Sequence, residues 1–129
     1  MRRRMVASIV FAAALAGLAG AAAAADVIAK GTFAGASGHV TSGGVSVERT
    51  DAGTKVVLQQ DFSLDSAPDP KVGFGRDGVY DKEAQLAPLA ANKGSQSYPV
   101  PDTVDPEKYN EVYIWCEKYS VPLGVAKLQ

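Results

Sequence analysis

The sequence predicts an all-β protein, a compact antiparallel β-sandwich or small barrel with at most one short helix. Short runs rich in Val, Thr, Phe and Tyr recur along the chain and are separated by Gly, Pro, Asn and Asp. Turn signals return about every 8–12 residues, which is typical of antiparallel sandwiches and barrels. Within several runs, apolar and polar residues alternate, as expected for strands that bury one face.

The first half of the chain predicts three strands joined by glycine-containing turns. Gly35-Ala-Ser-Gly38 is a turn signal, and Asp51-Ala-Gly53 is typical of a hairpin. The Gly43-Gly44 pair indicates a bulge or tight turn within the second strand. The expected strands are Val27–Phe33, His39–Arg49 and Lys55–Leu64.

The middle of the chain is less regular. Pro68-Asp-Pro70 ends the preceding segment, and a short strand is expected at Val72–Phe74. Arg76-Asp-Gly78 indicates a turn before Val79 and Tyr80. Ala84–Ala91 fits either a short helix or a strand interrupted by Pro88, and the pattern does not choose between them.

The last third begins with another turn, Asn92-Lys-Gly94, and then an expected strand, Ser95–Val100. Pro99 and Pro101 place that strand at a sheet edge, because proline cannot donate a hydrogen bond to a neighbouring strand. Val104–Lys108 contains Pro106 and is expected to form one helical turn.

Two strands are expected at the end of the chain, Tyr109–Tyr119 and Val121–Leu128. Strand alternation divides the first of these into two faces: Val112, Ile114 and Cys116 on one, Tyr113, Trp115 and Glu117 on the other. Both faces carry large apolar groups, which predicts a central position in the sheet.

Residues 1–25 are expected to be a secretory signal peptide that is cleaved before Asp26. Arg2, Arg3 and Arg4 precede an apolar run, and the run ends in the small-residue pattern Ala23-Ala-Ala25 that signal peptidase accepts. A retained membrane anchor is the alternative, because about 20 apolar residues suffice to span a bilayer. We expect export to the periplasm or the cell exterior, with no membrane span after cleavage.

The remaining residues, 26–129, are expected to form a single domain. Three of the chain's 13 basic residues lie in the signal, so this part carries ten basic and 14 acidic residues, a formal charge of −4. A two-domain enzyme is excluded by length, since about 100 residues enclose a single core. A nucleic-acid binder is also excluded, because it would require a basic surface.

His39 and Cys116 are the chain's single histidine and single cysteine. A blue-copper site needs two His and one Cys, and a structural zinc site needs four Cys or His ligands, so neither forms within one chain. Covalent c-type haem needs a C-x-x-C-H motif, which is absent. Noncovalent haem would have His39, Cys116, a Tyr or a Lys as ligands to iron. Hydrolase, P-loop and dinucleotide fingerprints are absent from the sequence.

Cys116 has two interpretations. Its apolar neighbours favour a buried, inert thiol, which is common for a free cysteine. The other interpretation is a reactive thiol, because Lys118 would share its face on a strand and a nearby ammonium stabilises thiolate. His39 is expected to be a turn or edge residue. Asp61, Asp65 and Asp69 are interpreted as turn-capping carboxylates, since their spacing matches no calcium loop.

The order of motifs resembles the DM-thirteen domain, an extracellular module whose family name carries the label "electron transfer". The resemblance covers about residues 27–129, and its most specific part is Tyr109-x-x-Val112-Tyr-Ile-Trp115-Cys116. The other matching motifs are Gly31-Thr-Phe33, His39-Val-Thr-Ser-Gly43, Leu58 with Asp61-Phe62, Pro68-Asp69, Val72-Gly-Phe-Gly75, Gly94, Tyr98-Pro-Val-Pro101 and Tyr119-x-Val121-x-x-Gly124-x-Ala126.

The resemblance implies a β-sandwich-like domain whose defining cysteine is Cys116. It also implies a role in redox or electron transfer, through a bare thiol or a bound group such as haem. In larger proteins such domains lie beside DOMON modules and cytochrome b-type reductases. Tyr119 departs mildly from the family pattern, in which Phe is more usual.

Two functional hypotheses follow. In the first, the chain is an exported redox or electron-transfer module that serves an envelope redox partner. Cys116 is its redox thiol or haem ligand, Trp115 packs beside Cys116, and His39 is a second haem contact. In the second, it is a noncatalytic envelope module that binds a small ligand or a protein. Cys116 is then a core residue, and the loop near 61–70 lines the contact surface. Neither hypothesis requires the chain to be a stand-alone enzyme.

Overall fold

The computed structural model describes residues 25–129. The expected signal peptide therefore lies outside the described residues except for Ala25. In the described part of the chain, no helix is long and apolar enough to cross a membrane.

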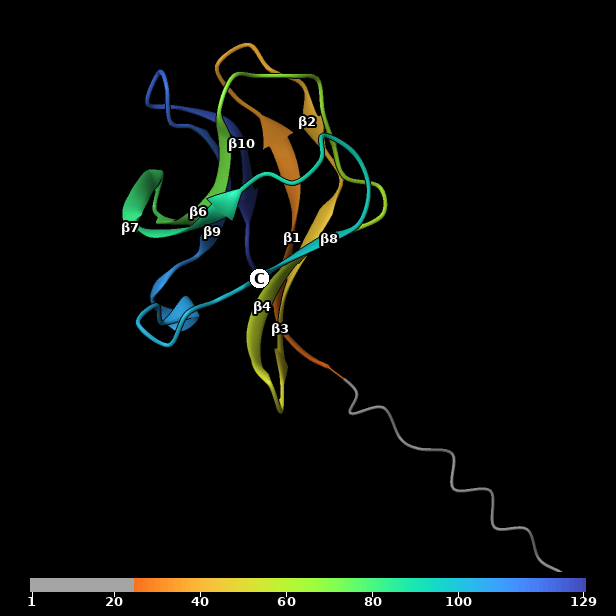
Figure 1. Ribbon diagram of the computed structural model, residues 1–129, viewed down its shortest axis with the longest axis vertical. Helices are drawn as coiled ribbons and strands as arrows, with labels where there is room; N and C mark the ends of the chain where they lie inside the picture. Colours follow the sequence, from red (N-terminus) through yellow and green to blue (C-terminus); the bar gives the residue numbers. More distant parts are fainter. Residues whose placement is uncertain (1–24) are drawn as a thin grey trace, which may run out of the picture.

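Ten strands and a single 3-10 turn make up the secondary structure of residues 25–129, so the all-β prediction is confirmed (Figure 1). The 3-10 turn η1 (Pro106–Lys108) falls within the expected helical turn, and the Asp105 side chain caps it by accepting from the Glu107 amide. The strands are β1 (Asp26–Gly35), β2 (Thr41–Ser42), β3 (Gly44–Thr50), β4 (Gly53–Leu58), β5 (Ser63–Leu64), β6 (Pro70–Arg76), β7 (Val79–Pro88), β8 (Gln96–Pro99), β9 (Glu111–Cys116) and β10 (Val121–Lys127).

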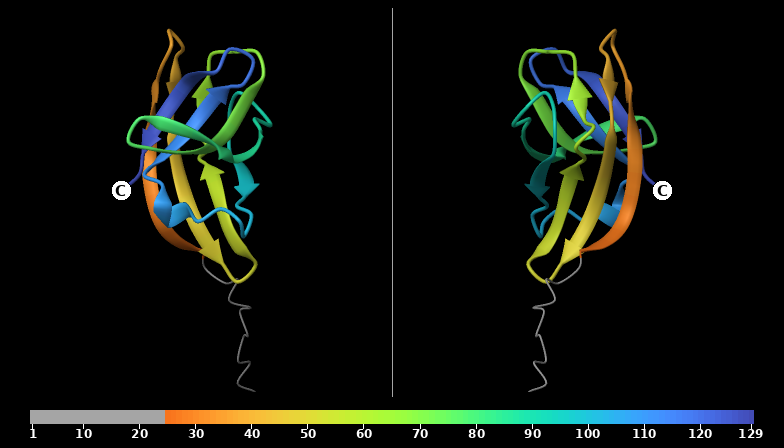
Figure 2. Two further views of the ribbon diagram at one scale, coloured as in Figure 1. Left: turned by 90° about the vertical axis from the view of Figure 1, so that its left-hand side faces the viewer. Right: turned by 90° about the vertical axis from the view of Figure 1, so that its right-hand side faces the viewer.

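Eight of these strands form one antiparallel sheet in the order β7-β6-β9-β10-β1-β3-β4-β8. The first part of β1 pairs with β3 and its last residues pair with β10, so β1 joins the two halves. Figure 2 shows the strong curvature of this sheet. The curvature brings its two edges together, where the Ala90 amide after β7 donates to the Tyr98 hydroxyl of β8. The architecture is a nearly closed barrel, one of the two forms that the sequence allowed.

The interior of the barrel is filled by alternate residues of these strands. Phe33 and Phe62 pack edge to face, with ring centroids 5.5 Å apart. Each large side chain buried in this way stabilises the fold by about 1.5–3 kcal/mol. The largest fully buried side chains are Phe62, Phe74, Leu58, Leu64, Ile114, Leu123, Val45, Val47, Val56, Val72, Val112 and Cys116.

Two expected strands are interrupted, and the two interruptions lie against each other. His39–Arg49 divides into β2 and β3 at Gly43, whose φ of 96° suits glycine. Lys55–Leu64 divides into β4 and β5 at a turn that contains Asp61. A side chain at Gly43 would meet the Asp61 carbonyl oxygen at 2.5 Å. The tight turn or bulge expected at Gly43-Gly44 is thus confirmed. The prediction of an unbroken strand over Lys55–Leu64 was wrong, because this close contact requires both segments to bend.

The undecided segment Ala84–Ala91 is a strand as far as Pro88, where β7 ends. β7 is irregular, because Gly75 pairs with Tyr80 whereas Gly73 pairs with Gln85. The intervening residues 81–84, which lie opposite Phe74 alone, therefore loop out of the pairing and form a bulge larger than the usual one extra residue.

β9 lies between β6 and β10, which confirms the central position expected for this strand. It ends at Cys116, however, and residues 117–120 form a turn in which Ser120 has a φ of 51°. The prediction that Lys118 shares a strand face with the cysteine was wrong, because strand alternation stops at Cys116. The Lys118 ammonium instead lies over the Tyr119 ring, 5.4 Å from its centroid.

Candidate functional site

Cys116 is the last residue of β9 and faces the barrel interior. Its side chain is 1% exposed and belongs to the hydrophobic core. It pairs across the sheet with Pro70 of β6 and Val121 of β10. The thiol donates to the Pro68 carbonyl oxygen at 3.2 Å, so its polar hydrogen has a partner within the protein.

Residues 65–69, here called the cover loop, supply that carbonyl and are anchored at both ends. At one end, the Asp65 carboxylate accepts from the amides of Val40 and Ser66. At the other end, the Asp69 carbonyl accepts from the Glu117 amide at 3.2 Å, directly beside the cysteine. The Asp69 backbone has a φ of 52°, a conformation that Asp tolerates better than most residues. Access to the thiol on this side is therefore governed by the cover loop.

His39 lies at the surface beside the cover loop. Its Nδ1 is 3.0 Å from Asp65 Oδ1, which makes an exposed ion pair when the ring is protonated. The backbone donors Ser66 and Val40, followed by the His39 ring, lower the pKa of Asp65 to about 2. His39 and Cys116 thus contact different residues of one loop, Asp65 and Pro68. The turn position expected for His39 is confirmed.

Of the three aspartates that the sequence indicated as turn-capping carboxylates, only Asp65 caps a neighbouring backbone amide, that of Ser66. Asp61 instead joins two segments by accepting from the Gly44 amide at 2.9 Å, and Asp69 forms an ion pair with Lys71 at 3.1 Å. In residues 25–129 no cluster of three His, Cys, Asp or Glu side chains could hold a metal ion.

Trp115 lies on the opposite face of β9 from Cys116, in an aromatic cluster outside the barrel. The cluster consists of Tyr80, Tyr113 and Trp115. The Trp115 ring stacks on Tyr80 with centroids 4.4 Å apart and planes 13° from parallel. Tyr113 meets Trp115 edge-on, with centroids 6.3 Å apart. Trp115 is therefore next to Cys116 along the chain, but the strand backbone separates their side chains.

Two glycines of β6 make room for this cluster. A side chain at Gly75 would lie 2.3 Å from Tyr113 Cε2, and one at Gly73 would lie 2.7 Å from the Tyr80 hydroxyl. The two tyrosine rings therefore lie directly on the β6 backbone. Burial, with a contribution from Glu111, raises the pKa of Tyr113 to about 12. Burial likewise raises the pKa of Tyr80, with smaller contributions from the Glu117 and Asp81 carboxylates.

A small ion network borders the cluster. Lys71 pairs across the sheet with Trp115, and its ammonium is 3.1 Å from Asp69 and 3.4 Å from Glu117. The hydrogen bond to Asp69, with help from Glu117, raises the pKa of Lys71. Lys71 therefore ties the cover loop to the turn after Cys116.

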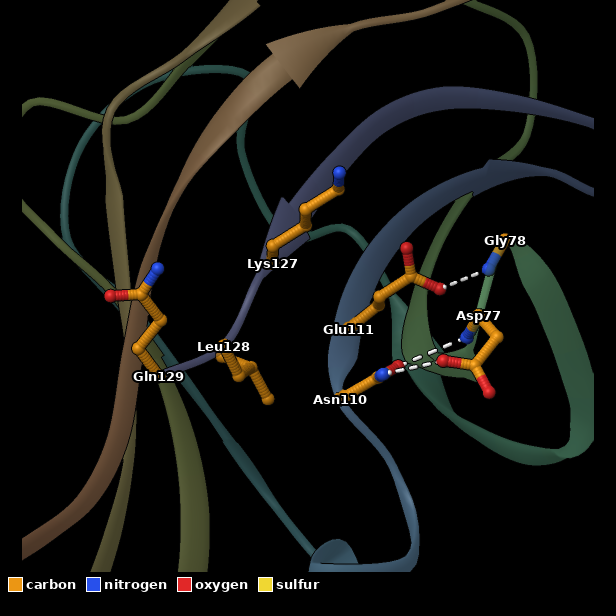
Figure 3. Close-up of a pocket in the computed structure, with 7 residues that line it drawn as sticks. All are labelled: Asp77, Gly78, Asn110, Glu111, Lys127, Leu128 and Gln129. Carbon is orange, nitrogen blue, oxygen red and sulfur yellow. Dashed lines mark hydrogen bonds between the residues drawn. The ribbon is translucent and has the colours of Figure 1, made fainter.

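A surface hollow of about 540 Å³ lies at the other end of β9 (Figure 3). Its floor holds Glu111, which is only 5% exposed. Glu111 Oε1 accepts from the Gly78 amide at 2.7 Å and from the Tyr113 hydroxyl at 3.3 Å. Lys127, which pairs with Glu111 across the sheet, and Gln129 also line the hollow (Figure 3).

Comparison with known proteins identifies the family to which the chain belongs. The family model described as "Electron transfer DM13" matches residues 32–128, about three quarters of the chain. The chain belongs to the DM13 family. No curated protein and no solved structure matched it. The match falls within residues 27–129, where the sequence motifs indicated the same family, so that prediction is confirmed.

This DM13 domain does not fit the haem hypothesis. A haem iron bound to Cys116 would need an open space beside a thiol that is 1% exposed and already donates to Pro68. His39, the second candidate contact, lies at the surface and is held by Asp65. Two hollows of about 540 and 520 Å³ are lined by other residues, and neither includes His39, Trp115 or Cys116.

The DM13 domain also contains site residues that sequence reasoning missed. Tyr80 stacks on Trp115, and Lys71 pairs with Trp115 across the sheet. Both residues lie on strands that are far from β9 in the sequence. The signal that could have found Tyr80 is the Val72-Gly-Phe-Gly75 motif. Two glycines on one face of a strand indicate that another group approaches the backbone closely.

Proposed function

We propose that this DM13 domain is a small electron-transfer module whose redox-active group is the Cys116 thiol. The observation that carries the proposal is the family match over residues 32–128 in a chain with a single cysteine. Two features of the structure support the proposal. The cover loop covers the thiol on one side of β9, and the oxidisable rings of the aromatic cluster lie on the other side.

The proposed step is a one-electron oxidation. Cys116–SH loses one electron to an oxidised metal centre of a partner protein and one proton to solvent, and becomes the thiyl radical. A one-electron reductant and a proton restore the thiol. A single cysteine has no intramolecular partner with which to form a disulfide, so a dithiol cycle would need a second protein thiol.

Burial favours electron transfer over thiol exchange. Exchange requires direct attack by a thiolate on a partner disulfide and therefore access to sulfur. An electron can leave a buried group without such contact. We expect a thiol reagent to modify Cys116 slowly in the native protein and rapidly after unfolding. Rapid native modification would instead favour an exchange mechanism.

The test measures how many equivalents of a one-electron oxidant the protein consumes and how much free thiol remains. The mature chain is oxidised without oxygen by photogenerated tris(bipyridine)ruthenium(III), with and without ascorbate, beside Cys116→Ser. Wild type should consume one oxidant equivalent more than the variant and lose its thiol, as measured by titration after unfolding. With ascorbate present, the thiol should survive repeated cycles. Equal oxidant consumption, with the wild-type thiol intact, would overturn the proposal.

A second candidate function is noncatalytic binding, and the hollow beside Glu111 favours it. The Glu111 carboxylate, fixed by the Gly78 amide, and Lys127, its cross-strand neighbour, both line a space large enough for a small polar ligand. Cys116 would then be a packing residue. In the same experiment this function predicts no difference in oxidant consumption between wild type and Cys116→Ser.

We also propose that the domain acts in the periplasm or outside the cell, after cleavage before Asp26. The support is the sequence of residues 1–25, with its three arginines, apolar run and terminal alanines. N-terminal sequencing of the protein recovered from its source cells should begin at Asp26. A start at Met1 in the membrane fraction would indicate a retained anchor.

A further inference from the structure

The aromatic cluster offers a path for electrons between the surface and the buried thiol. Trp115 and Tyr80 are both partly exposed, whereas Cys116 is buried. Trp115 directly precedes Cys116 in β9, so a single peptide unit of the strand connects the residue that carries the indole to the residue that carries the thiol. Tryptophan and tyrosine side chains, like cysteine, lose single electrons to strong oxidants.

The surroundings of Trp115 suit it to hold a positive charge for a short time. Its Nε1–H is buried and has no hydrogen-bond partner among residues 25–129. An oxidised indole therefore has no neighbouring base to take its proton, and it remains a radical cation. Asp69 and Glu117 lie near, bound to Lys71, which is the cross-strand partner of Trp115. The two carboxylates outweigh the single Lys71 ammonium, so this group carries a net negative charge that favours a cation on the ring.

Tyr80 is less suited to hold the charge. A phenol gives up its proton when it is oxidised, and the Tyr80 hydroxyl donates to the side-chain amide oxygen of Gln85 at 2.9 Å. An amide oxygen is too weak a base to keep that proton. The stacked phenol instead spreads and screens the charge on Trp115, because the two rings lie 4.4 Å apart and nearly parallel.

We propose that Trp115, stacked on Tyr80, is the electron exit of this domain. The inference rests on the electron-transfer function proposed above. The oxidised metal centre of a partner takes one electron from Trp115, which becomes a radical cation. Cys116–SH then returns one electron to the indole and releases one proton to solvent. The indole is restored, and the oxidised group is now the Cys116 thiyl radical.

Flash photolysis tests the relay, because Trp115 is the chain's single tryptophan and any indole radical signal belongs to it. Photogenerated tris(bipyridine)ruthenium(III) oxidises the mature chain, and transient absorption follows the indole radical. We expect the radical to live several-fold longer in Cys116→Ser than in wild type. We expect Trp115→Phe to lose the signal and to slow thiol loss several-fold.

The matched control is Tyr119→Phe, since Tyr119 is 63% exposed and lies close to Cys116 in sequence but outside the cluster. It should leave both rates unchanged. Thiol loss at the wild-type rate in Trp115→Phe would overturn the relay and leave the redox role of Cys116 intact. An intact thiol in wild type, with equal radical lifetimes in wild type and Cys116→Ser, would overturn the proposed function itself. The lifetime comparison keeps Trp115 in place, so it does not depend on how Trp115→Phe folds.

Discussion

The Cys116 thiol combines core packing with a hydrogen bond to Pro68, and both affect its chemistry. The core position keeps the sulfur away from solvent, and the proton that the thiol donates to Pro68 has to leave before a thiyl radical forms. Oxidation at this position therefore depends on the cover loop as well as on the sulfur. The sequence signal for a reactive thiolate was Lys118, and that residue lies over Tyr119 instead.

Replacing Cys116 with Ala should lower the free energy of unfolding by about 1–3 kcal/mol, because the change opens a small cavity and leaves the Pro68 carbonyl without its donor. Urea unfolding of the mature chain measures this. Tyr119→Phe, at an exposed position, should stay within about 0.5 kcal/mol of wild type. An unchanged urea midpoint for Cys116→Ala would show that the thiol contributes nothing to packing.

Alternation along β9 was enough to predict which face Cys116 and Trp115 occupy, because period two is a local property of a strand. It was not enough to predict Tyr80 and Lys71 as neighbours of Trp115. Their positions depend on the register of β6 and on the bulge in β7, and both are set by pairing between distant segments.

The cover loop is the element that joins the candidate residues. It has no strand pairing of its own, and it is positioned by Asp65 at its start and by the Asp69–Lys71 and Asp69–Glu117 contacts at its end. Loops held by a few polar contacts open more readily than paired strands. Changes in these contacts should therefore alter exposure of Cys116 before they unfold the barrel.

Acid should weaken the start of the cover loop. The folded-state pKa of Asp65 is about 2, below its ordinary value of 3.8, so its stabilising contribution is present above pH 3.8. That contribution is lost as the pH falls through about 2. Asp65→Asn should therefore show a smaller loss of stability than wild type between about pH 4 and pH 2, as measured by urea unfolding.

Asp51→Asn, in the β3–β4 hairpin, is the matched control, because it removes a carboxylate away from the cover loop. It should retain the acid dependence of wild type. If Asp65→Asn and wild type lost stability in parallel, the bonds from Val40, Ser66 and His39 would not be anchoring the loop.

At the scale of the whole molecule, the sequence did not distinguish a β-sandwich from a barrel. That distinction depends on which strands pair with each other, and local sequence patterns do not encode strand pairing. The strand pairs β6–β9, β1–β10 and β4–β8 all join segments that are not consecutive. The β7 bulge and the register shifts in β1 and β10 help the sheet to curve, as bulges do in barrels generally. The curvature leaves two edge strands, β7 and β8, close enough to be joined by side chains.

Tyr98 makes that junction. Its ring is 4% exposed, and its hydroxyl accepts from the Ala90 amide and contacts the Gln96 side chain. Tyr98→Phe keeps the ring and removes the hydroxyl, so it should cost about 0.5–1.5 kcal/mol of unfolding free energy. Hydrogen exchange at the Ala90 amide should become faster, while amides of the central strand β9 keep their protection. Tyr119→Phe should change neither. Unchanged exchange at Ala90 would mean that packing of the Tyr98 ring, rather than its hydroxyl, holds the two edges of the barrel together.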